Sequence, residues 1–500
     1  MLRPWSTRLT ISEDKRKPLY IRITDSIIEA IKSGTLKPGE VLPGSRQMAA
    51  MLKVNRNTIT KAYDILLVEG WLNSSERKST YVSEQLFTET QTIKNKVTKT
   101  IDKNGSGKKT LFFDHGLPDT SIAPMDELAR AYRRIFSRKA KWQLLATGNE
   151  LGDQQFREAI SKMLNHHKGM ATSANELCIT RGTQMSLFLT AHTLLAPGDI
   201  VLIENPGYRP AWNVFEHVGA KLIPIDMDCE GINVEQVEFI LTHTPVKALY
   251  LTPHHQFPTT VTLSLSRRLK LIALSNRYGF TIIEDDYDSE FYYGQRPKRP
   301  VCSHYELNHF IYLGTFSKLI APAIRIGYLY SSHSFIERIG ALRRIIDFQG
   351  DRIMEESILE LIHTGAIRRH QKKALSYYQR KRDFLCELLD KYLQDKVSYR
   401  IPDGGLALWL TFNEKIDLFK LHAIAHEKGL VFHTPDRFSF DEMIPGIRIG
   451  YASLTENQME KGIQILRGCS RDSSIFAPNQ LQVKSVYRTW SMFKEKPGKV

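Results

Sequence analysis

Three separated segments of the chain contain residue types that could act together in cofactor binding or catalysis. Segment 282–287 (IIEDDY) is an apolar strand that runs into acidic residues. Segment 313–318 (LGTFSK) ends a predicted strand in small hydroxyl residues, followed by a single lysine, Lys318. Segment 180–184 (TRGTQ) joins a predicted strand to a helix through Gly182.

The chemistry of these segments is complementary. Carboxylates at the carboxyl ends of parallel strands face the edge where α/β sheets bind ligands. A lysine in a dry pocket among other cations has a lowered pKa and forms a Schiff base with an aldehyde. Free N–H groups at a helix start hold phosphate. Each feature alone is more often structural, but pyridoxal phosphate needs a lysine, a carboxylate for its pyridinium nitrogen and a phosphate cradle, so together they predict that cofactor.

The elements that must position these residues form an alternating series beyond residue 111. The predicted strands, each a short apolar run, are 177–180, 200–204, 221–225, 248–251, 281–284, 310–313 and 324–330. Predicted helices include 183–195 and 264–278, and residues 336–395 are almost wholly helical. This succession predicts an α/β domain with a large, mainly parallel sheet, followed by a small C-terminal α/β lobe.

A different pattern occupies residues 18–83. Apolar residues recur at three- and four-residue steps in three stretches, which predict helices over 18–31, 45–53 and 56–69. Ser45 is expected to cap the second helix. Two short runs, 71–73 and 80–82, can then pair as a hairpin. Three helices followed by a hairpin make a winged helix-turn-helix.

The domain organisation follows from these patterns. Residues 84–110 are polar with few large apolar side chains, so we expect a flexible linker there. The larger domain is expected to extend over 111–467. Residues 468–500 form a C-terminal tail with no clear role.

The positive charge of the chain is concentrated near its N-terminus. Residues 1–110 contain 20 Lys and Arg against 11 Asp and Glu, which is +9 of the total of +15. Such a basic module indicates a nucleic-acid partner, because neutralising phosphates releases counterions. Charge alone fits a merely soluble basic domain equally well.

Composition excludes several other classes. Apolar residues at 42% and charged residues at 25% are ordinary for a globular protein. There is no run of about 18 apolar residues and no apolar core of a signal peptide, so we expect a cytoplasmic protein without a membrane partner. The five cysteines are scattered without metal-ligand spacing, so neither a metal site nor a disulfide framework is expected.

Two blocks of sequence carry a resemblance to known families. Residues from about 111 to 466 resemble the fold-type I aminotransferases, most specifically in GTFSKLIAPAIRIG (314–327) and IIEDDYDSEF (282–291). Residues 18–72 resemble the GntR winged-helix family. Both modules in this order resemble the MocR/GabR group of bacterial regulators.

The resemblance implies a role for each residue of the cofactor site. Lys318 would form the Schiff base, Asp285 would pair with the pyridinium nitrogen, and Tyr287 would bond the phenolic oxygen. Tyr208 would stack on the cofactor ring. The residues expected to hold the phosphate are Gly182, Thr183, Gln184, Thr315, Ser317 and Arg325.

The resemblance also implies an amino compound as ligand. Arg448 matches the arginine that grips an α-carboxylate, a role that suits a bidentate guanidinium. Arg209 is a second expected anion contact, and a structural ion pair is the alternative for both. Fold-type I aminotransferases build their sites at a dimer interface, so a homodimer is expected, arranged head to tail as in the regulator group.

One block departs from the enzyme pattern. Many fold-type I aminotransferases have an Asn-Pro-Thr-Gly segment where this chain reads TPHHQFPTT (252–260). The regulator group shares the His-Gln-Phe-Pro run, which favours a regulator. Thr260 replaces an expected glycine, so the turn geometry and any cofactor contact by His255 or Gln256 stay open.

In the N-terminal module, the helix over 56–69 is the expected recognition helix in the DNA major groove. The positions that match DNA-facing residues of the family are Arg46, Arg56, Asn57, Thr58 and Lys61. Arg56 is expected to make a bidentate contact to guanine, and the others to contact phosphates. A solvated helix face is the alternative for Lys61. The wing over 74–80 lacks the glycines usual in the family.

Three functions are compatible with this architecture. The favoured one is a transcription regulator whose aminotransferase-like domain senses an amino compound through pyridoxal phosphate and alters binding to a double-stranded DNA operator. The second is a true aminotransferase that carries a winged helix. The third is a regulator that has lost the cofactor and uses the large domain to dimerise. Whether transaminase chemistry is complete, partial or vestigial stays open.

Overall fold

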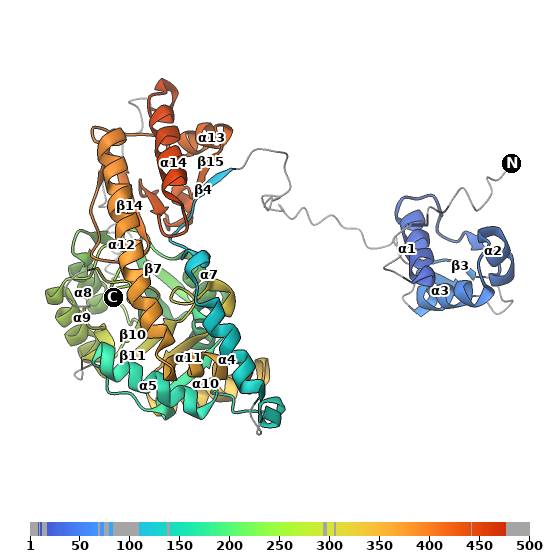
Figure 1. The fold of residues 1–500 in the computed structure, drawn as a ribbon, viewed down its shortest axis with the longest axis horizontal. Helices are drawn as coiled ribbons and strands as arrows, with labels where there is room; N and C mark the ends of the chain where they lie inside the picture. The colour runs from blue at the N-terminus through green and yellow to red at the C-terminus, as the bar shows by residue number, and fades with distance from the viewer. Residues whose placement is uncertain are drawn as a thin grey trace, which may run out of the picture. The chain divides into compact units, whose positions relative to one another are not determined.

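The computed structural model describes residues 9, 11–12, 18–68, 71–74, 80–83, 110–137, 141–293, 298–304, 307–441 and 443–476. The chain divides into two compact units, residues 1–106 and 107–500 (Figure 1). Almost all of the expected linker, the expected wing tip and residues 477–500 lie outside the described residues. None of the described helices is long and apolar enough to cross a membrane.

The first unit contains three helices and a small antiparallel sheet. The helices are α1 (Leu19–Lys32), α2 (Ser45–Leu52) and α3 (Arg56–Val68). The strands pair in the order β1 (Val41–Leu42), β3 (Thr80–Val82) and β2 (Leu72–Ser74). The apolar faces of all three helices and the sheet share one buried core. This is a winged helix-turn-helix, and β1 is a third strand that the sequence did not predict.

The start of α2 differs by one residue from the prediction. Gly44, not Ser45, occupies the N-cap position, and Ser45 is already the first helical residue. The helix ends at Lys53, whose φ of 55° places it in the left-handed region.

An eight-stranded sheet forms the centre of the second unit. The strands are β5 (Leu177–Thr180), β6 (Ile200–Asn205), β7 (Lys221–Asp228), β8 (Gly231–Ile232), β9 (Ala248–Leu251), β10 (Thr281–Asp286), β11 (Phe310–Thr315) and β12 (Gly327–Tyr330). Their order is β5-β12-β11-β10-β9-β6-β7-β8. Only β12 and β8 run against their neighbours, so the sheet is mainly parallel as predicted.

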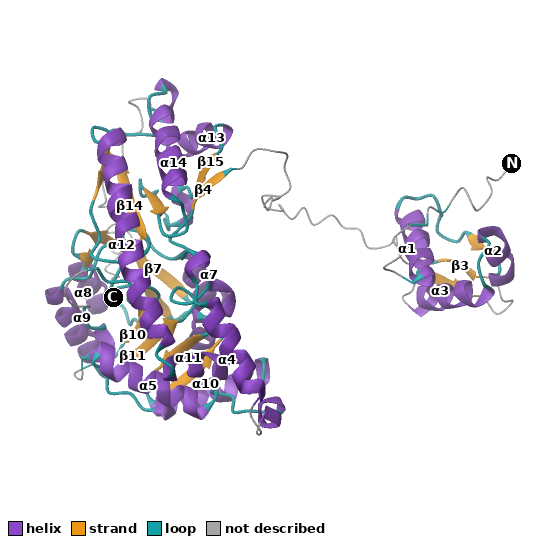
Figure 2. Cartoon of the chain, viewed as in Figure 1, coloured by secondary structure: helices purple, strands orange, loops and turns teal. Residues whose placement is uncertain are grey.

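Helices cover both faces of this sheet (Figure 2). One face packs against α6 (Thr183–Leu194), α7 (Arg209–His217) and α10 (His333–Ile346). The hydrophobic core on the other face includes residues of α4 (Met125–Ser137), α5 (Gln154–Lys168), α8 (Val234–His243), α9 (Leu265–Tyr278), α11 (Arg352–His363) and α12 (Ala366–Leu393). Ile282 and Ile283 of β10 belong to opposite layers, so the strand is buried on both sides, as expected for parallel sheets.

A small lobe follows α12. Its antiparallel sheet has the order β13 (Val397–Tyr399), β14 (Ala407–Phe412) and β16 (Ile447–Gly450), and its helices are α13 (Leu418–Glu427) and α14 (Glu456–Cys469). A second, two-stranded sheet pairs β15 (Leu430–Phe432) with β4 (Leu111–Phe113) in parallel. The start of the second unit therefore belongs to the small lobe, which the sequence did not predict. The described part of the tail packs here too, through the buried Ile475.

Candidate functional site

A cavity of about 180 Å³ lies at the carboxyl ends of β9, β10 and β11. Eight residues predicted for the cofactor site line it: Thr183, Tyr208, Asp285, Tyr287, Thr315, Ser317, Lys318 and Arg325. Residues that the sequence reasoning did not propose also line it: His115, Leu117, Tyr250, Thr252, Phe257 and Pro322. The fold thus brings together segments that are more than 100 positions apart in the sequence.

Lys318 lies three residues beyond the end of β11. Its Nζ donates a hydrogen bond of 2.5 Å to the carbonyl oxygen of Gly116. Burial, supported by the cation of Arg448, lowers the pKa of Lys318 to about 8, although Asp288 opposes the shift. About one tenth of this lysine is therefore a neutral, nucleophilic amine at pH 7, far more than for an ordinary lysine.

Asp285 presents a carboxylate with one free oxygen. Its Oδ2 accepts a hydrogen bond of 2.8 Å from the hydroxyl of Tyr250, on the neighbouring strand β9. Its Oδ1 is buried and has no hydrogen-bond partner within the described part of the chain. Burial, together with repulsion from Asp286 and Asp288, raises the pKa of Asp285 to about 7. An unpartnered buried acceptor in a ligand cavity is suited to a cationic N–H donor.

A set of donors suited to an anion lies at the start of α6. This helix begins at Thr183 without a side-chain cap, so its first N–H groups are available to a ligand. The hydroxyl of Ser317 is buried and unpartnered among the described residues. Gly182, with φ of 77°, leaves room for Arg325, since a Cβ there would lie 2.7 Å from its Nη2.

Two predicted phosphate contacts have other partners. Thr315 Oγ1 donates to the carbonyl of Ile326 at 3.3 Å and accepts from the N–H of Ser317 at 3.0 Å, so it braces the turn before Lys318. The Gln184 side chain is exposed and donates to the carbonyl of Pro210 at 3.4 Å. The structure therefore places this side chain outside the cavity.

Aromatic side chains form one wall of the cavity. The rings of Tyr208 and Phe257 meet edge to face with 5.1 Å between centroids, and Tyr287 lies 6.3 Å from Phe257. The hydroxyl of Tyr287 donates to the carbonyl of His255 at 2.5 Å. Burial raises the pKa of Tyr208 to about 12, so it stays a neutral ring at physiological pH.

Arg448 lies behind this wall on β16, almost completely buried. It donates to the carbonyls of His115 at 2.9 Å and Pro258 at 2.7 Å, and to the Tyr287 hydroxyl at 3.3 Å. It forms no ion pair with a described carboxylate. Its positive charge is therefore not neutralised by a described carboxylate, although Arg448 is not among the residues that line the cavity.

Arg209 does not line the cavity. Its guanidinium donates to the carbonyls of Asp436 at 3.3 Å and Ser439 at 3.4 Å, and it lies 5.7 Å from the centre of the Trp212 ring. These contacts fasten α7 of the large lobe to the loop before β16 of the small lobe.

The unusual segment 252–260 supports the site from behind. His255 Nδ1 lies 2.7 Å from Asp288 Oδ1, and the Gln256 amide donates to the carbonyls of Pro206 at 2.7 Å and Phe257 at 2.6 Å. Neither side chain lines the cavity. Thr260 has φ of 61°, so the chain keeps the left-handed turn expected of a glycine, at a cost of roughly 1–2 kcal/mol.

The predicted DNA-facing residues lie at the start of α2 and α3. Arg46, Arg56 and Asn57 are exposed, and Thr58 is half-buried. Asn55 caps α3 by accepting a hydrogen bond of 2.9 Å from the N–H of Asn57. Lys61 is exposed, with its Nζ 5.8 Å from the centre of the Tyr20 ring on α1.

Comparison with known proteins identifies both units. Residues 116–466 match the model of the family described as aminotransferase class I and II. The chain belongs to this aminotransferase family. Residues 19–82 match the model of bacterial regulatory proteins of the gntR family.

Individual relatives of this family member fall into two kinds. An "Aromatic-amino-acid aminotransferase 1" from Thermococcus litoralis is 28% identical over 357 residues, 70% of this chain and 85% of its own length. A "Probable rhizopine catabolism regulatory protein MocR" from Rhizobium meliloti is 26% identical over 477 residues, 92% of this chain and 95% of its own. The kynurenine aminotransferase structure of Pyrococcus horikoshii, a complex with PMP, has a TM-score of 0.69 at 27% identity and covers 73% of this chain and 91% of that one.

The site residues fit pyridoxal phosphate, the cofactor that the aminotransferase family and its cofactor-bound neighbours imply. The cavity holds an amine at Lys318 for an aldehyde and an unpartnered Asp285 oxygen for a pyridinium N–H. It also holds the start of α6 and the free Ser317 hydroxyl for a phosphate.

Proposed function

We propose that the chain is a pyridoxal phosphate-dependent transcription regulator that binds double-stranded operator DNA through its first unit and an amino compound through its second. The observation that carries the proposal is the union, in one chain, of a winged helix with exposed Arg46 and Arg56 and a cavity holding Lys318 and an unpartnered Asp285 oxygen. The regulator relative, which aligns over 92% of this chain, supports it. Because residues 19–82 match bacterial regulatory proteins and the proposed partner is DNA, we propose a cytoplasmic location.

Each side chain has a distinct task in recognising the amine. Bound pyridoxal phosphate supplies an electrophilic aldehyde carbon that primary amines attack. Lys318 gives up the proton on Nζ readily because its pKa is about 8. The unpartnered Oδ1 of Asp285 would accept a hydrogen bond from the pyridinium nitrogen, and Arg325 with the start of α6 would hold the phosphate. Arg448 offers its guanidinium, beside Tyr287, to a carboxylate of the amino compound.

Binding of the amino compound can change the affinity for DNA only if the chain has two conformations that differ in their affinity for both ligands. The amino compound shifts their equilibrium by its differential affinity for each. Arg448 belongs to the small lobe and Lys318 to the large lobe. A ligand held by both residues therefore favours one closure of the lobes.

The active form is proposed to be a homodimer, head to tail. Large apolar side chains are exposed at Leu145, Ile345 and Phe348, with Ile345 84% exposed. The two segments that carry them are neighbours, because Gly148 N–H donates to Gln349 and Arg344 pairs with Glu150. Exposed apolar patches of this kind mark protein interfaces.

An active aminotransferase is the second candidate. Its support is the full set of Lys318, Asp285 and Arg448 and the likeness to the Thermococcus litoralis and Pyrococcus horikoshii aminotransferases. A sensor needs only to hold the amine, whereas an aminotransferase must also pass its nitrogen to a keto acid.

The test compares wild type with Lys318→Ala, which removes the nucleophile. In wild type we expect a near-visible cofactor absorption band that changes on adding an effective amine, together with altered DNA binding. Lys318→Ala should lose the band and the amine response but keep salt-dependent DNA binding. A panel of amino acids, each with and without a keto acid, completes the measurement.

Each outcome distinguishes the candidates. Catalytic nitrogen transfer to the keto acid, at many turnovers per chain, would favour the aminotransferase. Absence of the band from wild type saturated with pyridoxal phosphate would contradict both and favour a cofactor-free dimerisation scaffold. Loss of DNA binding in Lys318→Ala would assign the lysine a structural role.

A further inference from the structure

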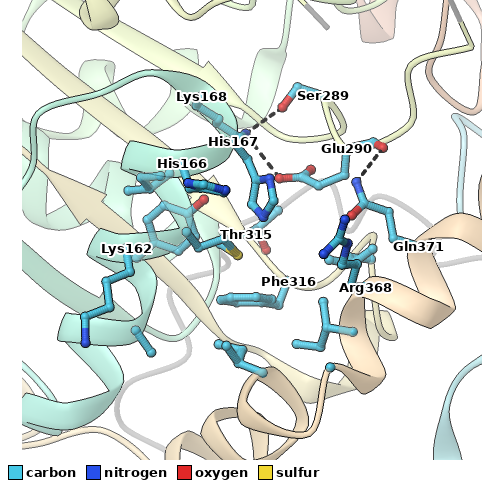
Figure 3. A pocket seen from close by; sticks show the side chains of 18 of the residues that line it. Lys162, His166, His167, Lys168, Ser289, Glu290, Thr315, Phe316, Arg368 and Gln371 are labelled. Carbon is cyan, nitrogen blue, oxygen red and sulfur yellow. Dashed lines mark hydrogen bonds and ion pairs between the residues drawn. The ribbon is translucent and has the colours of Figure 1, made fainter. Parts of the chain in front are cut away.

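A second, larger cavity of about 820 Å³ lies on the other face of the central sheet (Figure 3). It is enclosed by α5, by the junction of α11 and α12, by the loop after β10, and by the turn after β11. Ligand cavities in proteins typically have about 300–1,000 Å³, so its volume suits a small organic molecule.

The depth of this cavity is apolar. Phe316, Leu319 and Ile367 are buried side chains that line it, and Met163 and Ile362 add to the same wall. Water in such a space makes few hydrogen bonds to the apolar walls. An apolar group that displaces this water therefore binds favourably.

The polar inner wall contains a buried ion-pair network centred on Lys168, although Glu290 Oε2 and the Tyr328 hydroxyl have no hydrogen-bond partner among the described residues. Lys168, at the end of α5, donates to Asp286 at 2.8 Å, Ser289 at 2.6 Å and Tyr312 at 2.8 Å. It also lies 3.1 Å from a carboxylate oxygen of Glu290. With four oxygen partners, Lys168 has no donor left for a ligand.

The mouth is different, because its nitrogen-bearing side chains are exposed and two of them, Lys162 and Arg368, are cations. Lys162, His166 and His167 come from α5 and Arg368 from α12, and all four line the cavity. Figure 3 shows His167 and Arg368 projecting from opposite walls. Neither Lys162 nor Arg368 forms an ion pair with a described carboxylate, although Glu158 on α5 also borders the mouth.

We propose that this cavity is a second ligand site, for a small organic anion whose apolar body fills the depth and whose charged group stays at the Arg368 side of the mouth. An apolar interior below a cationic rim selects such a molecule over an apolar one and over an inorganic anion. The proposal does not depend on the cofactor or on DNA binding.

The second site adjoins the Lys318 cavity. Thr315 lines both cavities, and Phe316 and Leu319 flank the Ser317–Lys318 pair. The consecutive residues Asp285 and Asp286 bond to Tyr250 and Lys168, on opposite faces of β10. A ligand in the second site therefore contacts the segment that carries the cofactor lysine without entering its cavity.

The experiment uses the fluorescent anion 8-anilinonaphthalene-1-sulfonate, an aromatic sulfonate of the proposed chemistry. The full chain is first saturated with pyridoxal phosphate, which fills the Lys318 cavity. We expect saturable binding of one probe per chain with unchanged cofactor absorption. Arg368→Glu should weaken binding at least tenfold, because it reverses charge at the mouth. Ala159, on α5, is a buried residue that lines the cavity, so Ala159→Trp should fill the depth and abolish binding.

Arg369→Glu is the matched control. It makes the same charge change one residue along α12, but Arg369 borders a different hollow and donates to the Thr364 carbonyl. Binding should stay within twofold of wild type. Equal loss in Arg368→Glu and Arg369→Glu would overturn the proposal by showing a diffuse charge effect. So would many weak sites, binding that survives Ala159→Trp, or release of pyridoxal phosphate by the probe.

Discussion

Lys318 lies among opposing charges, and the balance sets its reactivity. Burial and Arg448 favour the neutral amine, whereas Asp288 and Asp114 favour the ammonium form. The net pKa of about 8 lies well below the ordinary 10.5. Since only the neutral amine attacks an aldehyde, the rate of cofactor capture depends on pH near neutrality.

We predict that the rate of pyridoxal phosphate capture by the cofactor-free chain rises with pH and levels off above about pH 8. Below pH 8 the neutral fraction of Lys318 rises about tenfold for each pH unit, because its pKa is about 8. The rate of capture should rise by the same factor. Stopped-flow absorbance between pH 6.5 and 10.5 measures the profile.

Arg448 provides a control for this profile. Arg448→Leu removes a cation and should move the midpoint to higher pH, while Arg448→Lys keeps the charge and should leave it in place. A wild-type midpoint near 10.5 would contradict the assigned environment of Lys318.

A second prediction concerns Gly182. An alanine Cβ would lie 2.7 Å from Arg325 Nη2 and displace the guanidinium. Gly182→Ala should therefore weaken pyridoxal phosphate binding about tenfold, or roughly 1.4 kcal/mol, and leave binding of phosphate-free pyridoxal unchanged. Equilibrium titration with both compounds checks this.

Gly198→Ala is the control that distinguishes the effect of the clash with Arg325 from the effect of placing alanine at a positive φ. Gly198 also has positive φ, at 90°, but a Cβ there meets no atom within 4 Å. Its affinity for pyridoxal phosphate should equal that of wild type. Equal losses for phosphate and phosphate-free compounds in Gly182→Ala would place Arg325 outside the phosphate site.

The predicted side chains that line the Lys318 cavity are mostly those whose direction is fixed by their position in the backbone. Asp285 lies at the carboxyl end of β10, Lys318 follows the end of β11 and Thr183 begins α6, so the fold directs all three into one cavity. Arg209 and Gln184 differ because their long side chains can reach several acceptors outside the cavity. Arg209 donates to the carbonyl of Asp436, which is 227 positions away in the sequence but close in space. Tyr250 was missed because its contact with Asp285 depends on the register of β9 against β10.

At the scale of elements, α3 combines a capped start with exposed polar residues. Asn55 fixes the first turn, and Arg56 and Asn57 project into solvent while Ile59, Ala62 and Leu66 remain buried. The helix is therefore held by its apolar face, and its first turn is free to meet a groove of DNA.

We predict that Arg56→Ala relaxes sequence preference at one base pair by about 1–3 kcal/mol. Fluorescence anisotropy with an operator selected from random DNA, and with its single-pair variants, measures this. Lys61→Ala should instead weaken binding to every sequence by a similar factor and lower the salt dependence. A uniform loss in Arg56→Ala would make Arg56 a phosphate contact.

Short elements limited what the sequence could reveal. Long periodic helices such as α1 and α9 were predicted within one or two residues. The strands β1 and β4 have only two and three residues, too few for an alternating pattern. Pairing with distant strands defines them, β1 with β3 and β4 with β15.

At the scale of the whole molecule, the exposed apolar surface around Ile345 and Phe348 predicts self-association. Ile345→Glu combined with Phe348→Glu should convert the proposed dimer into a monomer of 57.4 kDa, because each protomer would bury two carboxylates at the interface. Size-exclusion chromatography with light scattering measures the mass.

Phe419→Glu on α13 is the control, since Phe419 is also an exposed apolar residue but belongs to the small lobe. It should leave the mass unchanged. A monomeric wild type, or a dimer that survives the double substitution, would contradict the proposed interface.

The pairing of β4 with β15 determines which lobe holds the start of the second unit. The backbone arriving from the DNA-binding unit is fastened to the small lobe at Leu111–Phe113, and three residues later Gly116 receives the hydrogen bond from Lys318. A rotation of the small lobe relative to the large lobe therefore also moves β4, the strand with which the described part of the second unit begins.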